Sequence, residues 1–208
     1  MGRLANDLIK NGYLRSDAII DAFFNIHRIE FIPEDLAAQA EANIPLPIGY
    51  GQTISQPLTV AFMLELLDPK QGHNILDAGS GSGWTTGLLA YIVGEQGRVT
   101  SLEIIKELCE IGKKNVNKFG FVKKGIAEFY CESAEKGFKK NAPYDRILVS
   151  ASADEIPLAL KKQLVIGGKM VIPIMNGIWY IEKRGEDDFH IEKFPGFVFV
   201  PFVKGIDN

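Results

Sequence analysis

A glycine-rich turn after a short apolar run is the part of this sequence best suited to bind a small molecule. Residues 74–83 read Asn-Ile-Leu-Asp-Ala-Gly-Ser-Gly-Ser-Gly, and a helical pattern begins directly after them. Strand, tight glycine turn and helix N-terminus together hold nucleotide-like ligands in open α/β sheets, because glycine lets the backbone approach the ligand. Glu103 lies 20 residues after Gly83, where a carboxylate that binds ribose hydroxyls is expected. The sequence therefore predicts a site for a nucleotide-like ligand.

The spacing of the glycines excludes two common nucleotide sites. A dinucleotide fingerprint needs a third glycine at the position of Trp84, and the sequence has no G-x-x-x-x-G-K-[ST] phosphate loop. Asp-x-Gly-x-Gly-x-Gly, with an acid closing the strand, resembles instead the S-adenosylmethionine site of Rossmann-like methyltransferases. The alternative is a glycine-rich turn without a ligand. The resemblance assigns cofactor binding to Asp77, Ala78, Gly79, Ser80, Gly81, Ser82 and Gly83.

Length, composition and charge fit one globular domain. The 208 residues are 46% hydrophobic and 24% charged, which is enough for a substantial core. The formal net charge is −3 and the basic runs are short, which argues against a nucleic-acid partner. No apolar stretch approaches membrane-spanning length, and the N-terminus lacks the apolar region of a signal peptide. We therefore expect a cytoplasmic protein without a membrane partner.

The cysteines and histidines do not form a metal-binding pattern. Cys109 and Cys131 are far from a C-x-x-C spacing, and we interpret both as reduced packing residues. His27, His73 and His190 are scattered singly along the chain. We therefore expect no metal site.

Alternating strand and helix patterns around the glycine turn predict an α/β fold. We expect a Rossmann-like, doubly wound, mostly parallel sheet over residues 74–173, with helices on both faces. Residues 1–42 predict an N-terminal helical layer, in which Ser16 caps the second helix. Residues 174–208 predict an antiparallel extension of the sheet, and all of 1–208 is expected to form one domain. Strands are expected at 74–78, 98–102, 127–131, 146–150, 169–173, 178–182 and 197–200, and helices near 58–67, 84–93, 105–118 and 157–163.

A polar loop precedes the first helix of this core. Residues 43–57 contain three prolines and two glycines, together with free hydroxyl and amide side chains. The composition predicts no regular element, and long structureless loops inside compact domains are often functional. The alternative is a structural crossover whose polar groups are satisfied by turns.

At this point the motifs jointly resemble one family. Residues 47–57, Pro-Ile-Gly-Tyr-Gly-Gln-Thr-Ile-Ser-Gln-Pro, are similar to the signature loop of protein-L-isoaspartate (D-aspartate) O-methyltransferases. The resemblance covers nearly the whole chain, including residues 27–33, 77–83, 142–145, 163–168, 171–173 and 199–203. It implies methyl transfer from S-adenosylmethionine to the free α-carboxylate of isoaspartyl residues in damaged proteins and peptides. It also implies a monomer, with S-adenosylhomocysteine as the second product.

The resemblance also assigns site residues by position. Ser55 matches the family's active-site serine, Glu103 the acid that binds the ribose, and Glu132 with Ser133 the pair that contacts the adenine. The remaining implied cofactor contacts, besides the glycine turn, are Thr53, Ile54, Gln56 and Ile104.

Three departures from the family pattern affect the expected acceptor. Cys131-Glu132-Ser133 replaces Gly-Asp-Gly, so Glu132 would reach the adenine amino group with a longer side chain. Asn43 stands where an aspartate is common, and residues 150–153 replace an alanine-rich run. Each departure would retune the pocket without removing its chemistry.

The acceptor loop suits a carboxylate substrate. A carboxylate with a pKa near 4 is ionised at neutral pH, so methyl transfer needs alignment and no general base. We hypothesise that the Ser55 hydroxyl donates to one carboxylate oxygen and orients the other. Two alternatives remain at this point: a related methyltransferase acting on another carboxylate, a small molecule or tRNA, and a protein that binds the cofactor without turnover.

Overall fold

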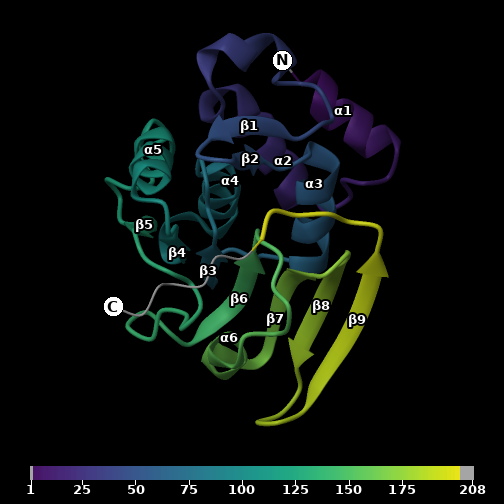
Figure 1. The fold of residues 1–208 in the computed structure, drawn as a ribbon, viewed down its shortest axis with the longest axis vertical. Helices are drawn as coiled ribbons and strands as arrows, with labels where there is room; N and C mark the ends of the chain where they lie inside the picture. Colours follow the sequence, from purple (N-terminus) through teal and green to yellow (C-terminus); the bar gives the residue numbers. More distant parts are fainter. Residues whose placement is uncertain (1, 202–208) are drawn as a thin grey trace.

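A seven-stranded sheet forms the centre of the computed structural model, which describes residues 2–201 (Figure 1). The strand order is β5-β4-β3-β6-β7-β8-β9. The five strands from β5 to β7 are parallel, and β8 and β9 continue the sheet in antiparallel pairing. The predicted α/β class and the antiparallel extension are confirmed. The strands are β3 (Asn74–Ala78), β4 (Arg98–Leu102), β5 (Ala127–Tyr130), β6 (Tyr144–Val149), β7 (Leu164–Ile174), β8 (Gly177–Lys183) and β9 (Phe189–Pro195).

The two faces of the sheet bury two separate hydrophobic clusters. Successive strand side chains point to opposite faces, so Ile75 packs in one cluster and Leu76 in the other. Three helices cover the first face, namely α3 (Pro57–Leu67), α4 (Trp84–Val93) and α5 (Lys106–Asn117). The short α6 (Leu158–Gln163) covers part of the second face, where Leu160 is buried. Helices on both faces are the doubly wound arrangement that the sequence predicts.

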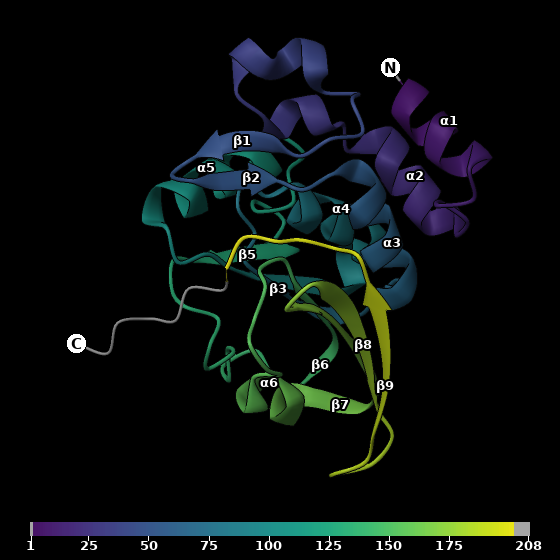
Figure 2. The ribbon, with the colours of Figure 1, turned by 45° about the vertical axis from the view of Figure 1, so that its right-hand side comes forward.

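The predicted N-terminal helical layer packs outside α3 and α4 (Figure 2). The ring centroids of Phe23 and Trp84 lie 5.5 Å apart, which couples the layer to the start of α4. Ser16 is the N-cap residue of the second helix, but its hydroxyl donates to Glu65 on α3 instead of capping. The layer consists of α1 (Arg3–Lys10), α2 (Asp17–Asn25) and the 3₁₀ helices η1 (Arg28–Phe31) and η2 (Glu34–Gln39).

The prediction of no regular element in residues 43–57 is wrong. This segment contains a two-stranded antiparallel hairpin, β1 (Leu46–Gly49) and β2 (Gln52–Ile54). Tyr50 and Gly51 at its turn have φ values of 54° and 70°, and tight hairpin turns favour positive φ at both central residues. Pro47 argues against a strand in the sequence, because proline cannot donate a backbone hydrogen bond. A two-stranded hairpin has free edges, where proline is tolerated.

The expected strand at residues 197–200 is also misplaced. The partner of β8 is β9, with the sequence Phe-His-Ile-Glu-Lys-Phe-Pro. Because β9 forms the exposed edge of the sheet, it carries charged residues and lacks the apolar pattern of a buried strand. After β9 the chain turns back toward the middle of the sheet and passes near the hairpin (Figure 2). There the Val200 carbonyl accepts a 2.8 Å hydrogen bond from the Ser152 amide. Residues 202 and 203 of the family-like end lie outside the described residues.

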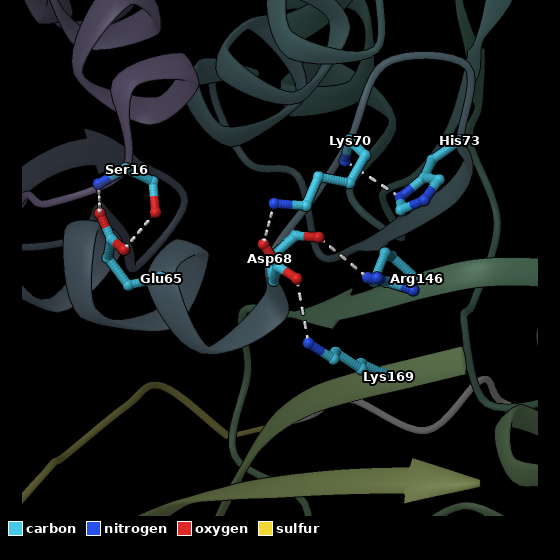
Figure 3. A network of polar contacts seen from close by, with 7 residues as sticks. All are labelled: Ser16, Glu65, Asp68, Lys70, His73, Arg146 and Lys169. Carbon is cyan, nitrogen blue, oxygen red and sulfur yellow. Dashed lines mark hydrogen bonds and ion pairs between the residues drawn. The ribbon is translucent and has the colours of Figure 1, made fainter. Parts of the chain in front are cut away.

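A cluster of paired charges fixes the amino-terminal edge of the sheet, where α3 ends (Figure 3). The Asp68 carboxylate pairs with Lys70 and with Lys169 of β7. The Asp68 carbonyl accepts from Arg146 Nε of β6 at 3.2 Å. Because α3 starts at residue 57, beside the polar hairpin, this cluster anchors the helix at the end far from that hairpin.

Candidate functional site

A pocket opens at the carboxyl edge of β3, β4 and β6, under the β1–β2 hairpin. In open parallel sheets this edge is where ligands bind, at the point where the strand order reverses. Here β4 lies on one side of β3 and β6 on the other, so the order of the strands reverses beside β3. The lining residues are 52–55, Val60, 79–82, Trp84, Thr85, 102–105, Glu132, Ala134, Ser150, Ala151, Val200 and Pro201.

Most of the sequence-predicted site residues meet in this pocket. Ten of them line it: Thr53, Ile54, Ser55, Gly79, Ser80, Gly81, Ser82, Glu103, Ile104 and Glu132. Five do not line it: Gln56, Asp77, Ala78, Gly83 and Ser133. Each of the five lies within two residues of a lining residue in the sequence, and their predicted contacts with the cofactor stay predictions.

The glycine turn is held open by backbone hydrogen bonds to β4. The amides of Gly79 and Ser80 both donate to the Leu102 carbonyl, at 2.8 and 3.2 Å. The Ser80 hydroxyl is buried without a hydrogen-bond partner among the described residues. An unpaired buried hydroxyl that lines a pocket is a ready donor for a polar ligand, because leaving it unpaired is costly.

Gly83 has a packing role. It is the N-cap residue of α4 with φ of 91°, and a Cβ there would lie 2.9 Å from the Gly112 carbonyl oxygen of α5. The third glycine of the motif therefore allows α4 and α5 to pack closely. The first two glycines face the pocket.

Glu103 and Asp77 make different contacts around the glycine turn. Glu103, predicted to bind ribose, accepts from the Gly81 amide at 2.8 Å and from the Ile105 amide at 2.9 Å. Asp77, which the resemblance assigns to cofactor binding, accepts from the hydroxyls of Thr85 and Thr86. Glu103 thus shapes the turn, and its carboxylate retains lone pairs for a ligand hydroxyl.

Asp77 is fully buried beneath the turn. Burial raises its pKa to about 6, hydrogen bonds from Thr86 and Thr85 oppose the rise, and the nearby Glu103 adds to it. One carboxylate oxygen, Oδ1, has no partner among the described residues. The carboxyl group is therefore poorly stabilised as an anion in this structure.

The acceptor side of the pocket is the strand β2 and the residue after it. Ser55 is half-buried, and its hydroxyl makes no hydrogen bond within the described part of the chain. Thr53 is exposed on the same strand, at the pocket wall. Thr53 and Ser55 therefore bring two hydroxyl-bearing residues to the hairpin side of the pocket.

Asn43 forms hydrogen bonds at the start of α3 through its side-chain oxygen and its carbonyl. Its Oδ1 accepts from the Leu58 amide at 2.9 Å, in the first turn of α3, and its carbonyl accepts from Gln56 Nε2 at 3.0 Å. An amide oxygen can satisfy a helix N-terminal amide as a carboxylate does. The departure at position 43 thus preserves the junction between the loop and α3.

The interpretation of the cysteines as reduced is wrong. Cys109 of α5 and Cys131 after β5, which are 22 residues apart in the sequence, form a disulfide. Sequence spacing could not reveal this pair because β5 and α5 are brought together only by the fold. The bond holds the start of the segment in which Glu132 and Ala134 line the pocket, while the Ser133 hydroxyl accepts from the Glu135 amide.

Several lining residues were missed from sequence. Ser150 and Ala151 follow β6 directly, so the same rule that selected the ends of β3 and β4 was able to find them. Trp84 both packs and lines the pocket: its indole N–H donates to the Ile26 carbonyl at 3.1 Å. Val200 and Pro201 carry no local signal, because only the return of the chain after β9 places them there.

Within residues 2–201 no group of three or more histidine, cysteine, aspartate or glutamate side chains is placed to hold a metal ion. The same residues include no helix long and apolar enough to cross a membrane.

Comparisons with known proteins find relatives in sequence and in fold. A protein from Methanopyrus kandleri named protein-L-isoaspartate O-methyltransferase is 42% identical over 205 residues, covering 97% of this chain and 90% of its own. A solved protein-L-isoaspartate O-methyltransferase superposes with a TM-score of 0.88 at 28% identity, covering 98% of this chain and 65% of the other. A Plasmodium falciparum protein assigned the same activity, solved with S-adenosyl-L-homocysteine, has a TM-score of 0.86 at 24% identity, covering 97% of both chains.

The family model of protein-L-isoaspartate(D-aspartate) O-methyltransferases matches residues 2–207, which is almost the entire sequence. The match includes the glycine turn, the hairpin with Ser55 and the segment after β5. This chain therefore belongs to the protein-L-isoaspartate(D-aspartate) O-methyltransferase family.

Proposed function

We propose that this chain transfers the methyl group of S-adenosylmethionine to the free carboxylate of L-isoaspartyl residues in damaged proteins and peptides. The observation that carries the proposal is the unpaired Ser55 hydroxyl opposite the glycine turn, in a chain of this family. The family membership favours this acceptor over another carboxylate, a small molecule or tRNA. The intact Ser55 loop favours turnover over cofactor binding alone.

The pocket fits S-adenosylmethionine in the chemistry of its donor groups. The buried, unpaired Ser80 hydroxyl and the carboxylate of Glu103 line one wall, where they would meet the polar parts of the cofactor. Glu132 lines the wall beyond β5, where the adenine amino group would find an acceptor. When bound, the cofactor supplies an electrophilic methyl group on a sulfonium.

Residues of the hairpin would hold the acceptor. The Ser55 hydroxyl would donate to one oxygen of the substrate carboxylate and leave the other oxygen free to attack. Alignment at close range lowers the barrier of such an in-line displacement, and the ionised carboxylate needs no base. The hairpin above the pocket would exclude water from the reacting groups.

We further propose that residues 1–208 act as one methyltransferase domain, as a monomer in the cytoplasm. The helical layer, the hairpin and the sheet all contribute to one contiguous hydrophobic cluster, which supports a single folding unit. The Cys109–Cys131 disulfide restricts that location to the cytoplasm of an organism in which intracellular disulfides persist, as they do in hyperthermophilic archaea and bacteria.

The proposal is tested with labelled S-adenosylmethionine and three synthetic peptides that differ at one residue. They carry L-isoaspartate, L-aspartate or D-aspartate at that position. We expect label on the isoaspartyl peptide, in an ester that base hydrolyses, and none on the L-aspartyl peptide. The D-aspartyl peptide defines the second half of the family activity. Cofactor binding without label on any peptide would contradict the proposal.

A further inference from the structure

Arg28 is a buried cation directly behind the acceptor hairpin. It is 4% exposed and its guanidinium donates to five backbone carbonyls. Three of the carbonyls precede β1, at Ala40 (3.4 Å), Ala42 (3.1 Å) and Ile44 (2.8 Å). Two lie at the end of β2, at its last residue Ile54 (3.5 Å) and at the following residue Ser55 (3.2 Å).

These contacts have no carboxylate among them. Burial lowers the pKa of Arg28 to about 10, so the side chain remains charged at neutral pH. The cation lies 5.5 Å from the centre of the Trp84 ring and is otherwise compensated by carbonyl dipoles. Burying a charge without an ionic partner is costly, and a fold that needed only rigidity would pack an apolar side chain here more cheaply.

The geometry links the two ends of the hairpin segment. One planar guanidinium joins the chain before β1 to the chain after β2, where the Ser55 carbonyl is a direct acceptor. A lysine ammonium cannot span both sides, because it lacks the rigid fork of donors. The position of the Ser55 backbone therefore depends on the guanidinium group itself.

We propose that Arg28 is a positioning residue for methyl transfer, which fixes the Ser55 hydroxyl toward the glycine turn by holding the Ser55 carbonyl. The proposal rests on the function proposed above. Arg28 acts through Ser55 and touches neither the acceptor nor the cofactor, because it does not line the pocket. Displacement of a reacting group by about 1 Å can cost about 100-fold in rate.

Arg146 provides a matched control at the opposite edge of the sheet (Figure 3). It is 8% exposed, and it too donates to backbone carbonyls, from Nε to Asp68 and from a terminal nitrogen to Asp145. It does not line the pocket. Arg146→Lys therefore reproduces the loss of a buried fork without touching the hairpin.

The experiment compares Arg28→Lys with Arg146→Lys on the isoaspartyl peptide. We expect Arg28→Lys to lower kcat by about 100-fold while the Kd for S-adenosylmethionine changes by less than about threefold. Arg146→Lys is expected to keep the wild-type kcat. Hydrogen exchange supplies a readout independent of activity: amides of residues 43–56 should exchange faster in Arg28→Lys and not in Arg146→Lys.

Chemical rescue separates positioning from a general loss of structure. In Arg28→Ala, ethylguanidinium at millimolar concentration should restore part of kcat, whereas ethylammonium should not. A cavity lined by Arg28, His27, Glu41 and Trp84 offers a route for the additive. Wild-type enzyme with the same additives is the control.

Several outcomes would overturn the proposal. They are wild-type kcat in Arg28→Lys, equal losses in Arg28→Lys and Arg146→Lys, or rescue by both additives. Arg28→Gln replaces Arg28→Lys if the ammonium prevents folding, and failure of both variants to bind cofactor makes Arg28 a folding determinant only. If wild-type protein methylates no isoaspartyl peptide, the proposed function fails, and hydrogen exchange still decides whether Arg28 fixes the hairpin.

Discussion

The two edges of the parallel sheet differ in how the polar groups described below are paired. At the amino-terminal edge, Asp68 pairs with Lys70 and Lys169, and its carbonyl accepts from Arg146 (Figure 3). At the carboxyl edge, the hydroxyls of Ser55 and Ser80 have no partner among the described residues. The amino-terminal edge leaves Asn74 Oδ1 unpaired as well, but Asn74 does not line the pocket, whereas Ser55 and Ser80 do. An unpaired polar group that lines a pocket is available to a ligand.

Two aspartates show the same contrast in their ionisation. Burial tends to raise the pKa of Asp68, but hydrogen bonds from Lys70 and Lys169 outweigh it and hold that pKa below its ordinary value. Burial raises the pKa of Asp77 to about 6, and the hydrogen bonds from the neutral hydroxyls of Thr86 and Thr85 oppose that rise without cancelling it. The two carboxylates differ in both burial and partners, because Asp77 is fully buried beside neutral hydroxyls and Asp68 is partly exposed beside two lysines.

The largest expected effect of breaking this contrast is on turnover. Ser55→Ala removes the free hydroxyl from the carboxyl edge, and we expect kcat to fall by about 100-fold or more with little change in cofactor affinity. Ser152→Ala is the control, because the Ser152 hydroxyl bonds the Met175 carbonyl and does not line the pocket. Steady-state kinetics on the isoaspartyl peptide measures both, and near-normal turnover in Ser55→Ala would rule out the proposed role.

Reduction of the disulfide should weaken the carboxyl edge and spare the amino edge. The bond closes a loop of 22 residues, and its loss is expected to lower the free energy of unfolding by about 3 kcal/mol. Urea denaturation with and without a dithiol reductant measures the change, and Cys131→Ser should not respond to reductant. Two titratable thiols in the unreduced, denatured protein would show that the bond is absent in solution.

Loss of Glu103 should affect the cofactor. A hydrogen bond to a carboxylate contributes about 1.5–3 kcal/mol, so we expect Glu103→Ala to weaken S-adenosylmethionine binding by roughly 10- to 150-fold. The structure adds a second cause, because the Gly81 amide loses its acceptor. Asp68→Ala at the other edge should leave the calorimetric Kd unchanged. Equal affinities in wild type and Glu103→Ala would exclude both roles.

The last comparison concerns the pH dependence of stability, in which the contributions of the two aspartates have opposite signs. The raised pKa of Asp77 stabilises the fold when the group is protonated, and this contribution is lost as pH rises from the ordinary value of 3.8 through about 6. Asp77→Asn should therefore gain stability relative to wild type over that interval.

The lowered pKa of Asp68 stabilises the fold above its ordinary value of 3.8, and this contribution is lost as pH falls through the lowered value. Asp68→Asn should therefore be less stable than wild type near neutral pH, and this difference in stability should disappear in acid. Melting temperatures of the three proteins from pH 3 to pH 8 test both signs. A constant difference between Asp77→Asn and wild type from pH 4 to pH 7 would contradict the assignment for Asp77.

The sequence by itself determined the elements whose signals are local. The apolar run, the acid and the glycines predict β3 at residues 74–78 and α4 at residues 84–93, and the structure has them there. The ends of β3 and β4 then place Gly79, Gly81 and Glu103 at one edge, because parallel strands end together. The family resemblance, carried mainly by residues 47–57, is confirmed. The ligand roles of the site residues remain predictions.

Only the tertiary structure decided which groups are partners. Glu103 and not Asp77 bonds the glycine turn, since Gly81 and Glu103 meet only when β3 and β4 pair. Contacts between distant segments likewise decide the disulfide and the pairing of the edge strand β9. They also decide the hydrogen bonds from Arg28 to the carbonyls on either side of the hairpin. A side chain's type limits the bonds that it can make, but the atoms that reach it are set by packing, and no local pattern records them.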